Sequence, residues 1–212
     1  MITVLGAGIV GLTTAHTLEE AGHEVRIIAA ASGAAITSAA AGAIWFPFRA
    51  DPPHRVNRWA NITRKWLSQI AAEHPTAGID VLDLHAYADT TESPWWAGAI
   101  DDLQPPIRGG PQAAFIWQFR APRIIPSTFC AFLEGNIRAE IEYRRLDSFD
   151  EVSDGPIINC TGLGSRKLAG DALLQGVWGQ TVITRTEGLD LSLIHISEPT
   201  RLRRISYAVF CL

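Results

Sequence analysis

A short apolar stretch that runs into a glycine-rich turn constrains this chain more than any other feature. Residues 2–6, ITVLG, form an apolar and β-branched run that predicts a buried strand. Gly6, Gly8 and Gly11 then follow the pattern G-x-G-x-x-G, and the residues after them have the apolar spacing of a helix. Residues 24–28, EVRII, predict a second strand. Because such crossovers are right-handed, the two strands are expected to be parallel neighbours in a βαβ unit.

This turn has the features of a site for the phosphates of a nucleotide. Glycine permits a tight turn, close approach of a pyrophosphate to the backbone, and close packing of the helix on the strand. The start of the helix adds unpaired N–H groups and the positive end of the helix dipole. We therefore predict nucleotide binding here, against the alternative of a glycine-rich turn with no ligand.

The second strand lacks the acidic residue that normally follows this motif and binds the ribose hydroxyls. Ala29, Ala30 and Ala31 carry no polar group, and Ser32 is the nearest substitute. The glycine pattern by itself also does not distinguish one dinucleotide from another. The choice of cofactor therefore depends on later segments.

Two later segments have the composition of backbone that approaches a ligand closely. Residues 36–48, ITSAAAGAIWFPF, are rich in small residues and lack the periodicity of a helix or strand. Residues 155–168, GPIINCTGLGSRKL, predict a short strand that ends in small residues. Asn159 and Thr161 then lie where a strand would bring backbone to a cofactor.

The order of these motifs resembles the D-amino-acid oxidase family, and the resemblance covers residues 1 to about 190. It implies an α/β fold in which a Rossmann-type FAD-binding domain is interrupted by an α+β substrate domain. Besides the glycine turn, the matching positions are Ala41, Gly42, Trp45 and Pro47 of an AGxxWxP-like loop, residues 159–166 (NCTGLGSR), and Gly179 with Gln180.

The resemblance implies FAD as the cofactor and assigns three segments to it: the glycine turn to the pyrophosphate, the small-residue loop to the flavin, and the NCTG segment to the adenine side. The implied cofactor residues are Gly6, Ala7, Gly8, Ile9, Val10, Gly11, Thr37, Ser38, Ala41, Gly42, Ala43, Ile44, Cys160, Thr161 and Gly162. Cys160 is expected to be structural, because no cation adjoins it in sequence to lower its pKa.

The implied domains are discontinuous, with residues 1–78 and 147–180 for FAD, and residues 79–146 and 181–190 for part of a substrate domain. Residues 191–212 are expected to be a non-native tail, because LSLIHISEPTR permits codons that match a transposase-based sequencing adapter. In the family, later residues supply the tyrosine and arginine that bind the substrate carboxylate. We therefore expect a C-terminally truncated, inactive fragment, and no catalytic residue is assigned.

The middle of the chain predicts a helix, two strands, a second helix and a further strand, at about residues 53–75, 78–89, 113–125, 125–137 and 139–146. In the first helix the spacing predicts one buried apolar face, formed by Val56, Trp59, Ile62, Trp66 and Ile70. Its solvated face is expected to hold Arg55, Arg58, Arg64 and Lys65.

Composition excludes several classes of function. The net charge of −4 favours neither nucleic acid nor an acidic membrane as a partner. The three cysteines have no metal-ligand spacing, and no run of 18 uncharged apolar residues occurs. We expect a soluble cytoplasmic protein without a metal, which binds a small-molecule substrate and forms a possible homodimer in its full-length form.

The resemblance implies oxidative deamination of D-amino acids to 2-oxo acids, with ammonia and hydrogen peroxide as the other products. Two alternatives stay open at this point. One is a related FAD amine oxidase, acting on glycine, sarcosine or D-aspartate. The other is a nucleotide-binding fragment without catalytic activity.

Overall fold

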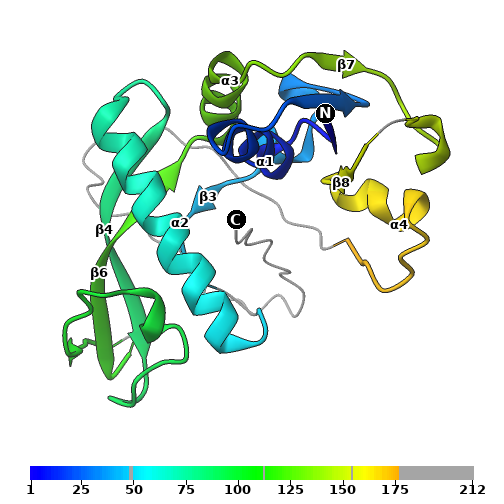
Figure 1. Cartoon of the computed structure of the whole chain (residues 1–212). Coiled ribbons are helices and arrows are strands. Elements are labelled where there is room, and N and C mark those ends of the chain that lie inside the picture. Colours follow the sequence, from blue (N-terminus) through cyan, green and yellow to red (C-terminus); the bar gives the residue numbers. More distant parts are fainter. Residues whose placement is uncertain (48–49, 112, 154, 177–212) are drawn as a thin grey trace. The chain divides into compact units, whose positions relative to one another are not determined.

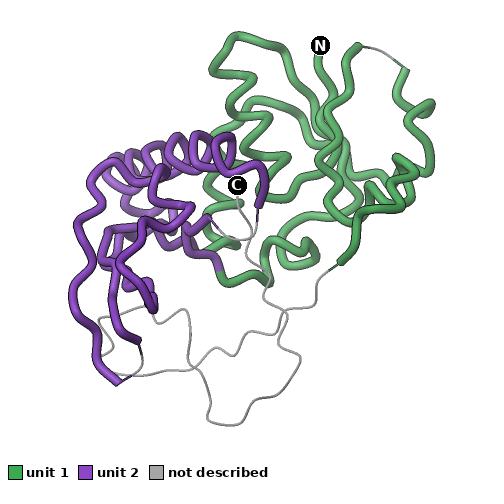
Figure 2. The backbone as a smooth tube through the Cα atoms, turned by 90° about the horizontal axis from the view of Figure 1, so that it is seen from below, with its two compact units in different colours: residues 1–42, 125–178 green, residues 43–124, 179–212 purple. Residues whose placement is uncertain are grey.

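The computed structural model describes the chain in four stretches, residues 1–47, 50–111, 113–153 and 155–176 (Figure 1). The predicted tail at 191–212 and the pair Gly179–Gln180 lie outside these described residues. The contacts divide the chain into two compact units (Figure 2). Unit 1 contains residues 1–42 and 125–178, and unit 2 contains residues 43–124 together with residues 179–212.

Unit 1 is built on a parallel sheet with the strand order β7-β2-β1-β8. Its strands are β1 (Ile2–Leu5), β2 (Val25–Ala29), β7 (Ile141–Tyr143) and β8 (Ile157–Asn159). In β1 and β2 the apolar residues are almost wholly buried, as in parallel sheets that are covered on both faces. The predicted βαβ unit is confirmed, because β1 and β2 are parallel neighbours.

Two helices supply most of the remaining core of unit 1. Helix α1 (Ile9–Glu20) packs on β1 and β2, and also on α3 (Pro126–Asn136). Leu12 of α1 and Phe129 of α3 are both at most 1% exposed. The shorter elements of the unit are η1 (Gly33–Ala35), η2 (Thr37–Ala40), η4 (Phe149–Glu151), η5 (Gly162–Gly164) and α4 (Ser165–Leu168).

Unit 2 is built on an antiparallel sheet in which β6 (Phe115–Ile124) is central. It pairs along its whole length with β4 (Ile79–Ala88), from Ile79 opposite Ile124 to Ala88 opposite Phe115. Two short strands, β3 (Ala43–Ile44) and β5 (Ile107–Arg108), pair with the two ends of β6. The sheet packs against α2 (Pro53–Glu73), and α2 also contacts η3 (Ala97–Ala99).

The boundaries between the units differ from those expected from the sequence. They fall at 42/43 and 124/125, instead of 78/79 and 146/147. Helix α2 belongs with β4 and β6, because it packs on both strands. Strand β7 belongs with unit 1, because its neighbour β2 donates a hydrogen bond from Ile27 to the carbonyl oxygen of Glu140 (3.0 Å). The assignment of one unit to FAD and the other to substrate stays a prediction.

The buried face of α2 also differs from the predicted face. Trp59 and Ile62 were expected in the core, but they are 54% and 56% exposed. Ala60 and Leu67 are buried instead, together with Val56 and Ile70 of the predicted set. At 3.6 residues per turn these four residues lie within an arc of about 80°, and Trp59 and Ile62 lie outside it. The prediction followed the large apolar side chains and missed the small Ala60, which lies at one edge of the buried arc.

The basic residues of α2 do not all lie on its solvated face. Arg55, Arg58 and Lys65 are exposed, as predicted. The side chain of Arg64 is only 13% exposed and is an exception. Its partners are described below.

Among the described residues, no helix is both long enough and apolar enough to cross a membrane. The same part of the chain contains no group of three or more histidine, cysteine, aspartate or glutamate side chains placed to hold a metal ion.

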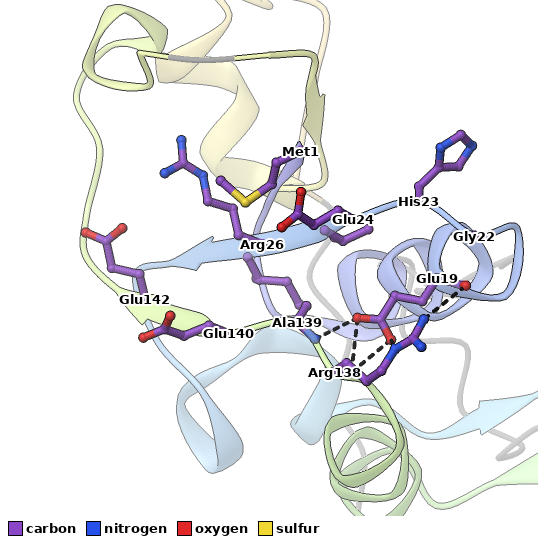
Figure 3. A pocket seen from close by; sticks show the side chains of 12 residues that line it. Met1, Glu19, Gly22, His23, Glu24, Arg26, Arg138, Ala139, Glu140 and Glu142 are labelled. Atoms are coloured by element: carbon purple, nitrogen blue, oxygen red, sulfur yellow. Dashed lines mark hydrogen bonds and ion pairs between the residues drawn. The ribbon is translucent and has the colours of Figure 1, made fainter.

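A largely buried carboxylate anchors the connection between α3 and β7 (Figure 3). The side chain of Glu19, at the end of α1, is 9% exposed. It accepts hydrogen bonds from the backbone N–H groups of Arg138 (2.8 Å) and Ala139 (2.6 Å). It also forms an ion pair with the Arg138 guanidinium at 3.6 Å. Glu19 therefore satisfies two backbone donors that precede the edge strand β7.

Replacing Glu19 with alanine is expected to lower the free energy of unfolding by about 1.5–3 kcal/mol, because two backbone N–H groups lose a charged acceptor. Glu20→Ala is the matched control, since Glu20 is the next residue and its side chain is 62% exposed. Urea unfolding followed by circular dichroism measures both variants. Equal midpoints for the two variants would contradict the anchoring role of Glu19.

Candidate functional site

The glycine turn between β1 and α1 is packed backbone against backbone. Gly6 has φ +105°, and a Cβ atom there would lie 2.5 Å from the carbonyl oxygen of Cys160. A Cβ atom on Gly11 would lie 1.8 Å from the carbonyl oxygen of Gly6. Both distances are too short for any side chain, so the protein itself requires glycine at these two positions. Gly8 differs, because a Cβ atom there would meet only the Ser38 hydroxyl, at 3.2 Å.

The start of α1 provides hydrogen-bond donors. The first bond within the helix runs from Leu12 N–H to Gly8 O (2.9 Å), so the preceding N–H groups have no partner within the helix. The N–H of Ile9 donates to the hydroxyl of Ser38 at 3.2 Å. No acidic residue occupies the first turn, and Val10 is 50% exposed. The positive end of the helix therefore has no negatively charged side chain in its first turn to offset it, as an anion site requires.

The segment after β8 lies beside this turn, because β8 is the parallel neighbour of β1. Cys160 N–H donates to Leu5 O at 2.8 Å. The side-chain oxygen of Asn159 accepts from the N–H (3.2 Å) and the hydroxyl (2.7 Å) of Thr161. It also accepts from the hydroxyl of Ser165 at 3.2 Å. This network holds the Cys160–Gly162 backbone at the carboxyl edge of the sheet, where α/β folds bind their ligands.

The small-residue loop is divided between the two units. Thr37, Ser38, Ala41 and Gly42 belong to unit 1, where Ser38 reaches the start of α1. Ala43 and Ile44 form β3 in unit 2 and pair with Ile124 and Arg123 of β6. Within unit 1 the structure therefore brings together the glycine turn, Ser38 and the segment Cys160–Gly162.

The end of β2 is where the motif lacks its acidic residue. The carbonyl oxygen of Ala29 accepts a hydrogen bond from Arg144 N–H (2.8 Å), so β7 brings a basic residue to this edge. The Arg144 guanidinium binds the carboxylates of Glu142 (2.7 Å) and Glu151 (3.3 Å). Backbone hydrogen bonds, with a contribution from the Arg144 charge, hold the pKa of Glu151 below its usual range. Arg144 was not predicted from the sequence, because its place depends on the pairing of β7 with β2.

The two described cysteines are electrostatically unsuited to redox chemistry. Burial raises the pKa of the Cys160 thiol, and a contact with the Thr14 hydroxyl at 3.7 Å opposes this only in part. Burial, with the charge of Glu134, raises the pKa of Cys130 to about 11. Both thiols are therefore protonated near neutral pH, which agrees with the structural role expected for Cys160.

A pocket of about 690 Å³ lies in unit 1 on another edge of the sheet (Figure 3). Its lining includes Met1 and Glu24, which precede β1 and β2, together with Arg26, Glu140 and Glu142. None of the predicted cofactor residues lines it. The pocket is at the amino ends of the strands, whereas dinucleotides bind at the carboxyl ends of such sheets. We therefore do not assign the cofactor to it.

Gly11→Ala is expected to prevent folding of unit 1 or to lower its melting temperature severely, since the added Cβ atom would overlap the Gly6 carbonyl oxygen. The matched control is Gly135→Ala in α3, where a Cβ atom meets nothing within 4 Å. This control should stabilise the chain by up to about 1 kcal/mol, because alanine favours a helix. Thermal unfolding measures both variants, and a Gly11→Ala chain with wild-type stability would contradict the packing described here.

Comparisons with known proteins agree with this geometry. The chain is 30% identical to a D-amino-acid oxidase of Rubrobacter xylanophilus, over 95% of this chain and 64% of that protein. It is also 30% identical to a D-amino-acid oxidase of Streptomyces coelicolor, over 89% of this chain and 60% of that protein. The chain thus spans less than two thirds of the length of these relatives. The first alignment extends past residue 190 into the predicted tail, so the non-native origin of that segment stays a prediction.

Solved structures share the fold at low sequence identity. The glycine oxidase of Geobacillus kaustophilus has a TM-score of 0.60 and 17% identity, over 80% of this chain and 57% of that one. The L-proline dehydrogenase of P. horikoshii has a TM-score of 0.58 and 17% identity, over 83% of this chain and 57% of that one. The predicted α/β fold is confirmed by these similarities.

Residues 1–113 match the family described as FAD dependent oxidoreductase (DAO). This match contains the glycine turn, the small-residue loop and most of unit 2. FAD is the cofactor that gives the family its description, which confirms the cofactor predicted from the sequence. The chain belongs to the DAO family of FAD-dependent oxidoreductases.

Proposed function

We propose that this chain carries the FAD-binding portion of an oxidase that deaminates D-amino acids. The observation that carries the proposal is the glycine turn, where backbone packing and the start of α1 form an anion site at the carboxyl edge of a parallel sheet. Membership of an FAD-dependent family supports the pyrophosphate of FAD as the anion at this turn.

The residues of this chain bind and orient the cofactor in this proposal. The backbone of the glycine turn, Gly6–Gly11, holds the pyrophosphate, and Cys160–Gly162 present backbone to the adenine side. Thr37, Ser38 and the segment 41–44 lie along the remainder of the cofactor. When bound, FAD supplies the acceptor for the hydride that leaves the substrate.

The proposed reaction converts a D-amino acid, oxygen and water into a 2-oxo acid, ammonia and hydrogen peroxide. Two relatives named D-amino-acid oxidase support this substrate class, each at 30% identity. A human D-aspartate oxidase at 29% identity supports an acidic D-amino acid as the second candidate. The similarity to glycine oxidase concerns the fold alone, so it does not select glycine. A cytoplasmic location and a homodimer of the complete protein stay predictions.

Gly8 provides a test of FAD binding that separates the ligand from the fold. Because a Cβ atom on Gly8 meets a single side-chain atom, the Ser38 hydroxyl oxygen at 3.2 Å, Gly8→Ala should keep nearly the wild-type melting temperature. It should still weaken FAD binding, since the Cβ atom takes space next to the pyrophosphate. Gly8→Asp adds a negative charge there and should raise the Kd for FAD at least about tenfold, or about 1.4 kcal/mol.

Titration of the apoprotein with FAD, followed by flavin absorbance and fluorescence, gives the Kd of each variant. The Gly8→Asp effect should shrink at high salt, because its cause is electrostatic. Gly135→Ala is the control with no expected effect on the Kd. Wild-type affinity in Gly8→Asp would argue against a phosphate at this turn.

Substrate class is tested by offering D-alanine, D-aspartate and glycine to the FAD-loaded proteins and following flavin bleaching and hydrogen peroxide. A full-length protein that contains this chain should respond to D-alanine at least about tenfold better than to glycine, as kcat/KM. The 212-residue chain alone should leave the flavin oxidised with all three. Preference for glycine would favour the amine oxidase alternative, and bleaching by the chain alone would contradict its predicted inactivity.

A further inference from the structure

The side chain of Trp45 is held by one turn of α2. The indole Nε1–H donates to the carbonyl oxygen of Ala60 at 2.9 Å, and this bond is buried. The guanidinium carbon of Arg64, one helical turn later, lies 5.9 Å from the centre of the Trp45 ring. Trp45 itself is 7% exposed, and its ring meets Phe119 of β6 edge-on. The indole is thus held both by a hydrogen bond and by a cation–π contact.

Arg64 also donates a hydrogen bond to the edge of β6, at a position where no strand of the described residues pairs with that edge. Strand β3 pairs with Arg123 and Ile124, and Trp45 N–H then donates to Pro122 O at 2.8 Å. Successive carbonyls on one side of a strand are two residues apart, so the next acceptor on this edge is Arg120 O. Arg64 Nε–H donates to that carbonyl oxygen at 3.0 Å. The Arg64 side chain therefore continues the row of hydrogen bonds along β6 beyond Trp45, the last described main-chain donor of the loop on this edge.

The remaining donors of Arg64 fix its direction. Its Nη2 atom lies 2.8 Å from a carboxylate oxygen of Asp102. The planar guanidinium thus makes two hydrogen bonds at a set angle and lies over an aromatic ring, which a lysine ammonium at this position does not reproduce. The next residue, Lys65, is different, because its side chain is 63% exposed and forms a surface ion pair with Asp101.

We propose that Arg64 is a positioning residue for the small-residue loop, residues 36–48. By holding Trp45, it sets where Ala43 and Ile44 lie along β6, directly before Trp45 in sequence. The inference rests on the proposed function, in which the segment 41–44 lies against FAD. Arg64 makes no contact with the cofactor in this account and acts through Trp45.

The test uses the 212-residue chain with Arg64→Met, Arg64→Lys and the matched control Lys65→Met. Arg64→Met keeps the apolar stem and removes the guanidinium. It should raise the Kd for FAD about tenfold, as expected for loss of a hydrogen-bonded charge, and should change the visible circular dichroism of the bound flavin. Arg64→Lys should lie between Arg64→Met and wild type, because it keeps the charge without the planar fork. Lys65→Met should match wild type in both measurements.

Flavin circular dichroism separates positioning from a merely structural role, since it reports the surroundings of the flavin in the folded, FAD-saturated protein. A lower melting temperature in Arg64→Met, with wild-type Kd and wild-type flavin signal, would overturn the inference. If Arg64→Met does not fold, Asp102→Asn weakens the same guanidinium contact at an exposed position and takes its place, with the same expected shifts in smaller amount. Wild-type values in Asp102→Asn and Arg64→Lys together would also overturn it.

Failure of the proposed function has a different signature. A wild-type chain that does not bind FAD would contradict that function, and the cofactor part of the inference with it. The contact between Arg64 and Trp45 is tested separately by a double-mutant cycle of Arg64→Met and Trp45→Phe on urea unfolding. Additive effects in that cycle would show that Arg64 does not hold Trp45.

Discussion

The candidate site depends on the close backbone packing at the glycine turn of unit 1. The carbonyl oxygens of Cys160 and Gly6 occupy the space where side chains on Gly6 and Gly11 would lie. This contact brings the end of β8 against the end of β1 and lets α1 begin directly over the sheet. The donors at the start of α1 and the backbone after β8 consequently face the same edge. The FAD site proposed at this turn thus has a steric basis as well as an electrostatic one.

Two charged side chains form hydrogen bonds with backbone groups that a neighbouring strand would otherwise pair with. Glu19 accepts hydrogen bonds from backbone donors ahead of β7, and Arg64 donates to the free carbonyl oxygen of Arg120 on β6. Both side chains are largely buried and well partnered, as a charge in such a place must be. Each lies where a short strand, β7 or β3, has limited main-chain pairing of its own. Side-chain hydrogen bonds therefore compensate for short strands in both units.

The small-residue loop, residues 36–48, contains the sequence boundary between the two units. Ser38 satisfies a donor of α1 in unit 1, whereas Ala43 and Ile44 are strand residues of unit 2. A single segment of small, incompletely buried residues is therefore divided between the two units. This division explains its sequence, since small side chains leave the backbone free to follow both surfaces, and the large Trp45 appears only where the loop enters the core of unit 2.

The sequence by itself determined the local elements that have strong signals: the strand before Gly6, the helix after it, the parallel neighbour β2, and the long strands β4 and β6. It also determined the family, because several short motifs occur in one order. Tertiary structure decided which sheet each element joined, since β7 reads as a strand in sequence but finds its partner only through hydrogen bonds to β2. It also decided that Ala60 is buried while Trp59 is exposed, and that Arg64 faces inward. Periodicity reports how apolar residues are spaced along a helix, but the neighbouring strands determine which arc of the helix is covered.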